Sequence, residues 1–213
     1  MKHSYKRYQT GDTEIIANND INFAIEKGEL VIILGSSGVG KSTVLNILGG
    51  MDNNDEGQVI IGGVDIANYS QKELTTYRRN DVGFVFQFYN LVPNLTAKEN
   101  VELASEIVAD ARDAEQTLID VGLGKCLNNF PAQLSGGEQQ RILIGNALLS
   151  DKKIFIFDEP TSGLDYEHML AVGKLLQELQ AAGKIVLVIT HDKELVTTVC
   201  DYQLDFAKYI SNE

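Results

Sequence analysis

The sequence predicts an α/β fold with a mostly parallel β-sheet, an N-terminal antiparallel β subdomain and an inserted helical subdomain. Three short apolar runs, at residues 30–34, 154–157 and 184–190, are separated by segments with helical spacing. Uninterrupted apolar runs of this length are typical of strands buried on both faces of a parallel sheet. Each run is followed by a polar or glycine-rich segment, so the pattern predicts reactive groups at the carboxyl ends of the strands.

The composition indicates an ordinary globular protein. The chain has 213 residues, of which 44% are hydrophobic and 23% are charged. This length suits one α/β domain, with or without an inserted subdomain. The formal net charge is −12. Because contacts to nucleic acid phosphates need a basic surface, this charge argues against a general affinity for nucleic acid or anionic lipid.

The sequence gives no sign of a disulfide framework, a signal peptide or a membrane span. Cys126 and Cys200 are the two cysteines, and they form no C-x-x-C pattern. Residues 1–12 lack the apolar segment of a signal peptide. No apolar run is long enough to cross a bilayer. We therefore expect a reducing compartment, and a membrane role only through a partner protein.

Residues 35–42 match the pattern G-x-x-x-x-G-K-[ST] between a predicted strand and a predicted helix. Glycines let backbone N–H groups wrap closely around phosphate oxygens, and the new helix adds a positive dipole end. Lys41 supplies charge for the β- and γ-phosphates, and Ser42 offers a hydroxyl to Mg²⁺. The alternative, a glycine-rich turn with an exposed lysine, is disfavoured by the flanking elements. The predicted nucleotide-binding residues here are Gly35, Ser36, Ser37, Gly38, Val39, Gly40, Lys41, Ser42 and Thr43.

The segments on either side of this loop predict strands and one helix. Residues 1–29 are expected to be rich in strand, with a turn at Gly11-Asp12 and a half-buried strand at 21–25. Tyr8 is either a surface aromatic at a sheet edge or a platform that stacks on a base. After the helix at 41–49 we expect strands at 57–61 and 82–86, separated by a helix at 71–79.

Residues 88–133 are predicted to be the helical insertion. Gln87 precedes them, either as an ordinary loop residue or as a group that faces the γ-phosphate and the metal. The apolar residues 88–92 either pack beneath a helix or contact a partner. A capping box at Thr96 opens a helix that runs to about residue 108, and a second helix spans 113–121.

A second candidate anion site begins at Ser135, which forms a capping box with Glu138. Gly136 and Gly137 follow in the first turn of this helix, although glycine is costly there. They are explained if another molecule approaches the backbone closely. A helix N-terminus with free N–H groups can bind an anion, but whether it meets the same phosphates within one chain is left open.

Two carboxylates and a histidine stand at predicted strand ends. Asp158 and Glu159 end the buried strand that starts at Ile154, and their side chains are expected to project differently because strand side chains alternate. One carboxylate can meet Mg²⁺ through water while the other faces an attacking water; the alternative is a solvated strand end. His191 follows the next apolar strand and is read as a site residue rather than a structural histidine.

These motifs together resemble the ATP-binding subunits of ABC transporters. The resemblance rests on residues 35–42, Gln87, LSGGE at 134–138, the strand at 154–159, SGLD at 162–165 and His191. It covers nearly the whole of residues 1–213 as a single ABC ATPase domain with a P-loop NTPase core. Residues 1–87 and 134–213 would form the nucleotide-binding core with its β subdomain, and residues 88–133 the helical subdomain.

The resemblance implies a role for each matched residue. Tyr8 stacks on adenine, and the phosphate loop binds ATP. The implied catalytic residues are Glu159 as general base, His191 as γ-phosphate contact, Gln87 as γ-phosphate sensor and Lys41. The implied metal residues are Ser42, Gln87 and Asp158. The residues implied to act in trans, on ATP held by a second copy in a head-to-tail dimer, are Ser135, Gly136, Gly137 and Asp165.

The resemblance therefore implies an ATPase that binds ATP and Mg²⁺ and drives an integral-membrane permease from the cytoplasmic face of the cell membrane, with no nucleic acid partner. Residues 5–141 resemble exporters of the macrolide, antimicrobial-peptide and lipoprotein-release type, whereas residues from 142 onward resemble ATPases of energy-coupling importers. Asn146 stands where the exporter type usually has arginine. We expect the exporter type; the alternative is an engineered or recombinant mosaic without a native permease, or a nucleotide-binding scaffold with little turnover.

Overall fold

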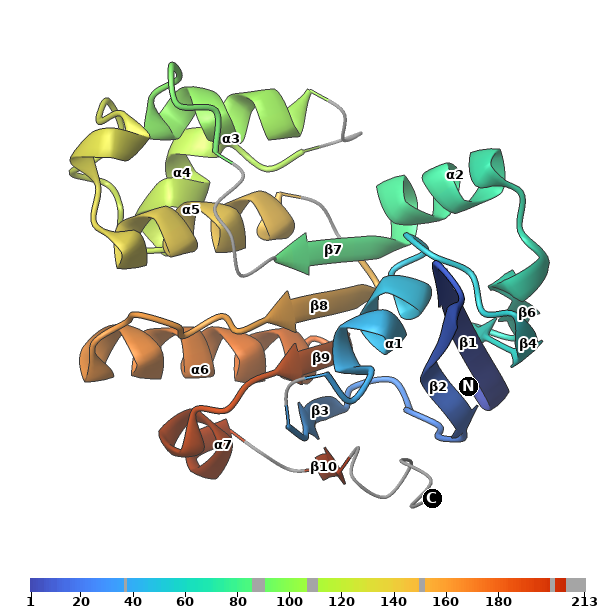
Figure 1. Ribbon diagram of the computed structural model, residues 1–213. Helices are drawn as coiled ribbons and strands as arrows, with labels where there is room; N and C mark the ends of the chain where they lie inside the picture. The colour runs from blue at the N-terminus through green and yellow to red at the C-terminus, as the bar shows by residue number, and fades with distance from the viewer. Residues whose placement is uncertain (37, 86–90, 107–110, 150–151, 200–201, 206–213) are drawn as a thin grey trace.

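A parallel sheet of five strands forms the centre of the protein (Figure 1). The computed structural model describes residues 1–36, 38–85, 91–106, 111–149, 152–199 and 202–205. Within them the sheet has the strand order β10-β3-β9-β8-β7, and every neighbouring pair is parallel. This confirms the predicted fold class. The strands are β3 (Leu30–Leu34), β7 (Val82–Val85), β8 (Ile154–Asp158), β9 (Ile185–Ile189) and β10 (Tyr202–Asp205).

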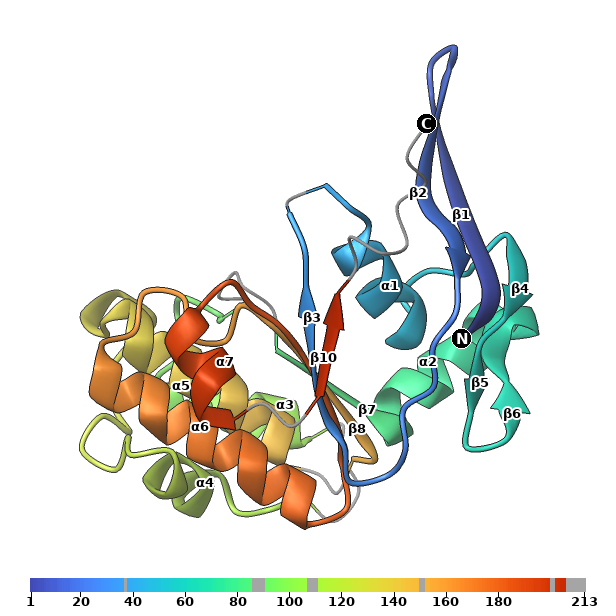
Figure 2. The same cartoon turned by 90° about the horizontal axis from the view of Figure 1, so that it is seen from below.

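The apolar strand residues are buried on both faces of this sheet. Along β3, Val31 and Ile33 join one buried cluster, while Leu30 and Ile32 join another. The first cluster packs under α1 (Lys41–Leu48), and the second packs under α5 (Gly136–Leu148) and α6 (Tyr166–Ala181). Figure 2 shows α1 on one side of the sheet and α5 and α6 on the other. Helices on both faces explain why the strand sequences are apolar throughout.

The N-terminal strands form the predicted antiparallel subdomain. β1 (Lys2–Thr10) and β2 (Thr13–Ile21) make a hairpin around the predicted Gly11-Asp12 turn. β4 (Glu56–Gln58) pairs with the other edge of β1, and β5 (Ile60–Ile61) pairs with β6 (Val64–Asp65).

Two strand predictions in this region are wrong. Residues 57–61 do not form one strand: β4 pairs with β1, β5 pairs with β6, and at Val59 between them the N–H donates to the Asp65 carboxylate rather than to a strand backbone. Residues 21–25 do not form a strand either. β2 already ends at Ile21, and the backbone of Phe23 pairs with the Met1 amino group and carbonyl, outside the bounds of β1.

The remaining helices follow the predicted positions closely. Capping boxes open α2 (Gln71–Asp81), α3 (Ala97–Ser105) and α5, as the sequence predicts for α3 and α5. The other helices are α4 (Ala114–Asp120), α7 (Lys193–Val199) and the 3₁₀ helices η1 (Ile66–Asn68) and η2 (Pro131–Gln133). None of the helices in the described part of the chain is both long and apolar enough to cross a membrane.

Helices α3, α4 and α5 share a third buried cluster, which lies apart from the sheet (Figure 1). Val101 of α3 and Leu118 of α4 pack with Leu134, which precedes α5, and with Ile142 in the middle of α5. Further along α5, Ile144 belongs instead to the cluster on the sheet. Helix α5 therefore joins the helical layer to the sheet, and the division of the chain at residue 133 stays a prediction.

Candidate nucleotide site

The segment between β3 and α1 has the geometry of a phosphate-binding loop. Gly38 and Gly40 have φ angles of 86° and 87°, which side chains rarely adopt. Gly40 is the N-cap of α1 and has no side chain to cap the helix, so N–H groups of the first turn are available to an anion. A Cβ at Gly40 would lie 2.0 Å from the carbonyl oxygen of Ala17 in β2. Both glycines are therefore required by the backbone path.

Lys41 points back into this loop. Its Nζ donates hydrogen bonds to the carbonyl oxygens of Gly35 and Ser36, each at 2.7 Å. The ammonium is thus held over the segment where the sequence predicts phosphate. Ser42 and Thr43 follow in the first turn of α1, as predicted. Ser37 and Gln87, both predicted site residues, lie outside the described residues.

Glu159 leaves the strand geometry of β8. Its φ angle is 52°, and its N–H donates to the carbonyl oxygen of Ile189 in β9 at 2.9 Å. The carboxylate accepts from the Thr190 hydroxyl at 3.3 Å, and its Oε1 lies 2.8 Å from His191 Nδ1. The structure therefore brings together the predicted carboxylate and histidine, because β8 and β9 are neighbours.

Charges at this end of the sheet influence one another. Burial raises the pKa of the Asp158 carboxyl, the Glu159 charge adds to the shift, and the Lys41 ammonium opposes it. The hydrogen bond to Glu159 and its charge raise the pKa of His191. A raised pKa favours imidazolium, in which both ring nitrogens donate. Nδ1 can then bond to Glu159 while Nε2 stays available to an anion.

Thr161, Thr190 and Asp192 support this arrangement and were missed by the sequence reasoning. The Thr161 hydroxyl donates to Asp192 Oδ2 at 2.8 Å, and the Asp192 N–H donates to the Thr190 hydroxyl at 3.0 Å. Asp192 Oδ1 accepts from the N–H groups of Glu194 and Leu195 at the start of α7. Aspartate is a preferred N-cap residue, so the sequence at Asp192 could have indicated the start of a helix there, although no helix was predicted at 193–199.

The segment around Ser135 does not meet the phosphate loop within this chain. Figure 1 shows α5 beginning at the end farther from α1. Ser135 forms the predicted capping box with Glu138. Gly136 and Gly137 follow it, and a Cβ at Gly137 would lie 2.8 Å from Leu164 Cδ2. Within one chain, the close neighbour of this glycine is therefore the loop after β8.

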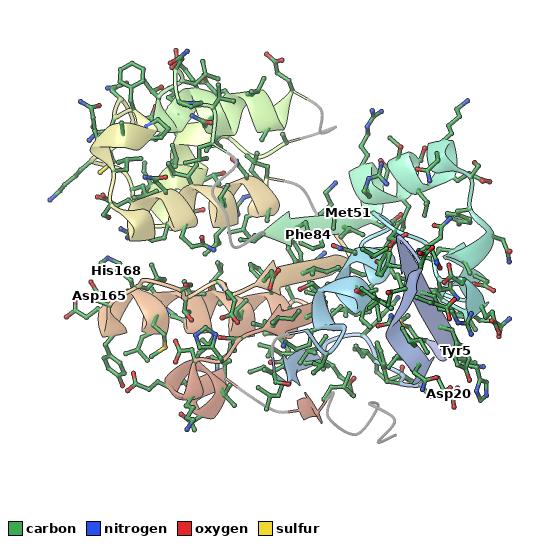
Figure 3. The ribbon with its side chains drawn as sticks, in the orientation of Figure 1. Tyr5, Asp20, Met51, Phe84, Asp165 and His168 are labelled. Atoms are coloured by element: carbon green, nitrogen blue, oxygen red, sulfur yellow. The ribbon has the colours of Figure 1, made fainter. Side chains whose placement is uncertain are left out.

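Asp165 lies on that same loop. It is the N-cap of α6 and accepts from the N–H of His168 at 3.0 Å, and its Oδ1 also lies 2.7 Å from His168 Nδ1 (Figure 3). Asp165 therefore has a structural role within its own chain, as the cap of α6, in addition to the role in trans that the resemblance implies. The starts of α5 and α6 together form one surface away from the phosphate loop.

Tyr8 lies beside α1 and is 37% exposed. Its hydroxyl donates to Asp52 Oδ2 at 2.7 Å. Burial and the bond to Asp52 raise the pKa of the Tyr8 phenol, while a hydrogen bond with the Thr43 side chain lowers it. Because Thr43 directly follows the phosphate loop in α1, an exposed aromatic ring lies next to the place where a nucleotide's phosphates would bind.

Comparison with known proteins gives consistent matches. The family model described as ABC transporter matches residues 18–162. An uncharacterized ABC transporter ATP-binding protein of Methanocaldococcus jannaschii is 43% identical over 201 residues, which cover 91% of this chain and 89% of that protein. The lipoprotein-releasing system ATP-binding protein LolD of Idiomarina loihiensis is 38% identical over 200 residues, which cover 91% and 88%.

Other matches show a partial overlap and a common fold. The macrolide export ATP-binding/permease protein MacB of Bradyrhizobium diazoefficiens is 40% identical over 200 residues, but this chain spans only 31% of it. A dimeric ATP-binding cassette, solved in a post-hydrolysis state with ADP and Pi, has a TM-score of 0.88 at 38% identity and covers 96% of this chain and 93% of its own. These matches extend across both parts of the chain and give no support to the mosaic or scaffold alternatives.

Proposed function

This chain belongs to the ABC transporter family of ATP-binding proteins, and on that basis we propose that it is the exporter-type ATPase subunit that pairs with a second copy and drives a separate permease. ATP binding and hydrolysis follow from the family. The observation that carries the proposal is the strand order β3-β9-β8. It gathers the phosphate loop, His191 and Glu159 at one edge of the sheet.

In the proposed reaction each of these residues has one task. Lys41 and the glycine backbone bind the phosphates. Glu159 accepts a proton from the attacking water, and Thr190 and His191 hold its carboxylate in place. His191 Nε2 donates to the γ-phosphate. Gln87, which lies outside the described residues, is proposed as the γ-phosphate sensor.

Mg²⁺ fits the oxygen donors of this site. No three His, Cys, Asp or Glu side chains gather as a metal cluster among the described residues. Mg²⁺ needs no such cluster, because it usually keeps several waters and binds through phosphates and one or two protein oxygens. The proposed donors are the Ser42 hydroxyl, Asp158 through water, and Gln87. The ion would neutralise charge on the phosphates.

The surface at the start of α5 is proposed to act on ATP held by a second copy. Gly136 and Gly137 supply the N–H groups of a helix N-terminus, and Ser135 caps that helix, but all three lie away from this chain's own phosphate loop. A head-to-tail pair would bring each α5 onto the other chain's ATP, with Asp165 at the seam. Similarity to the dimeric cassette supports this arrangement.

The helical layer is the proposed contact for the permease. It exposes apolar side chains at Val92, Leu103, Ile119 and Phe130, each at least 39% exposed. Residues 88–95, of which 88–90 lie outside the described residues, are proposed with them as the contact for the cytoplasmic end of a membrane protein. LolD, by its name, serves a lipoprotein-releasing system, and this supports the exporter type and a position at the cytoplasmic face of the membrane.

A glutamate substitution tests the reaction. Glu159→Gln removes the proton acceptor, so phosphate release from Mg·ATP should fall about 10²- to 10⁴-fold while ATP still binds. Glu178→Gln, at an exposed position near the other end of α6, is the matched control and should keep full turnover. Full turnover by Glu159→Gln would refute its role as general base.

A pair of serine substitutions tests the dimer. Ser135→Ala and Ser70→Ala each remove a capping box, so both should lose about 1 kcal/mol of stability. In a Glu159→Gln background with saturating Mg·ATP, we expect the dimer to weaken only for Ser135→Ala, measured by size-exclusion chromatography with light scattering. Equal dimer populations in the two variants would contradict action in trans.

A further inference from the structure

A buried lysine packs against the aromatic ring that is proposed to carry the base. Lys6 of β1 is 9% exposed. Its Nζ donates to Asp52 Oδ1 at 2.8 Å and to the carbonyl oxygen of Asn53 at 2.7 Å. The same Nζ lies 5.2 Å from the centroid of the Tyr8 ring. Asp52 Oδ2 accepts from the Tyr8 hydroxyl. One carboxylate therefore holds both the ammonium and the phenol.

This network fixes the Tyr8 ring from two directions. The hydroxyl at its edge is bound by Asp52 and interacts with Thr43. The Lys6 ammonium lies against the ring, where a cation is attracted to the π-system. Asp52 is itself held by the N–H of Asn53 at 2.8 Å. The ring is thus ordered before any ligand arrives, yet Tyr8 remains 37% exposed for stacking.

We propose that Lys6 and Asp52 are positioning residues that fix the Tyr8 ring for stacking on the base of ATP. They would raise affinity for the nucleobase and leave affinity for the triphosphate unchanged. The inference rests on the proposed function, in which Tyr8 is the base-binding residue. The physical reason is that an immobilised side chain loses no further rotamer freedom on binding, whereas a free tyrosine must be ordered by the ligand.

The chain contains a matched control for this network one residue away. The Arg7 guanidinium lies 5.5 Å from the centroid of the Tyr5 ring and pairs with Glu56 at 2.7 Å. It is again a cation, an aromatic ring and a carboxylate that join β1 to the segment after α1. Figure 3 shows Tyr5 on the outer side of β1, away from α1. Removing the Arg7–Glu56 pair should perturb β1 about as much as removing the Lys6–Asp52 pair, but it should not release the Tyr8 ring.

The test compares two probes by calorimetry, Mg·ATP and inorganic tripolyphosphate with Mg²⁺. Asp52→Ala and Lys6→Met should each weaken ATP about 3- to 10-fold and leave tripolyphosphate binding unchanged. Tyr8→Phe, which keeps the ring and removes its anchor, should weaken ATP by a similar factor. Combining it with Asp52→Ala should add little, because both changes release the same ring. Glu56→Ala should change neither affinity.

Several results would overturn the inference. An equal loss for both probes would mean that the network shapes the phosphate loop, and no loss for either would mean that it is irrelevant to binding. A comparison of ADP with pyrophosphate gives the correction for charge. If the unchanged chain, after this correction, bound Mg·ATP and tripolyphosphate with equal affinity, the base would contribute nothing to binding. If the unchanged chain bound neither probe and released no phosphate, the proposed function itself would fail. Should Asp52→Ala not fold, Tyr8→Phe decides alone.

Discussion

Gly40→Ala should damage both the fold and nucleotide binding. The new Cβ would lie 2.0 Å from the Ala17 carbonyl oxygen and 2.8 Å from Asn18 Oδ1, whereas ordinary contacts begin at 3.4 Å. The backbone there has a φ of 87°, and an L side chain in this region costs about 1–2 kcal/mol. Relief of the overlap should cost a further amount of about 1–3 kcal/mol. The expected total loss of stability is about 2–5 kcal/mol.

A second glycine separates the two contributions. Gly183 has a φ of 77°, but a Cβ there would meet no atom within 4 Å. Gly183→Ala should therefore lose only the backbone contribution of about 1–2 kcal/mol. Gly183 follows α6 and precedes β9, at the edge of the sheet opposite the phosphate loop. ATP affinity should fall for Gly40→Ala, because the loop must move away from β2, and should stay unchanged for Gly183→Ala.

Urea denaturation gives the two stabilities, and calorimetry with Mg·ATP gives the two affinities. Equal losses of stability in the two alanine variants would mean that the contact with Ala17 has no energetic consequence. The expected link to nucleotide binding fails if Gly40→Ala loses stability as expected but binds ATP like the unchanged chain. The loop would then bind phosphate without its close approach to β2.

Three further outcomes are expected. Lys41→Ala should weaken Mg·ATP binding about 10- to 100-fold by calorimetry, with little change in the urea midpoint; unchanged affinity would remove its phosphate role. Glu159→Gln should lower the pKa of His191 in an NMR titration, because Glu159 raises it in the unchanged chain. The contact between Glu159 and His191 therefore stabilises the folded chain at low pH, and this stabilisation is lost as the pH rises through the raised pKa of His191. Asn18 is 1% exposed, and among the described residues neither of its amide atoms has a hydrogen-bond partner. Asn18→Leu should therefore increase the free energy of unfolding by about 1–3 kcal/mol, measured in urea; a loss would show that the amide is needed.

Much of the central sheet could be predicted because burial on both faces leaves a direct signal. The runs at residues 30–34 and 154–157 contain no charged residue, and both are strands. The meeting of Glu159 and His191 also follows from general rules. Both residues directly follow parallel strands of one sheet, and the carboxyl ends of parallel strands lie at the same edge of the sheet.

Other features depend on tertiary contacts that local sequence does not encode. At the break between β4 and β5, the Val59 N–H donates to the Asp65 carboxylate rather than to a strand backbone. Gly137 looked costly as a helix residue, and nothing nearby in sequence indicates its contact with Leu164. Lys6 and Asp52 are 46 residues apart, and each is an ordinary charged residue until β1 packs against the segment after α1. Sequence reasoning found the reactive groups more readily than the residues that hold them.

The central position of β9 has a consequence for how the protein is made. β9 pairs with β3 on one edge and with β8 on the other, although its residues 185–189 are synthesised long after β3. Until then the facing edges of β3 and β8 have no strand between them, and unpaired apolar edges favour aggregation. Contacts between such distant segments also form slowly. We expect the sheet to close only after most of the chain has left the ribosome, so that a translational pause before residue 185 would prolong the exposure of these edges.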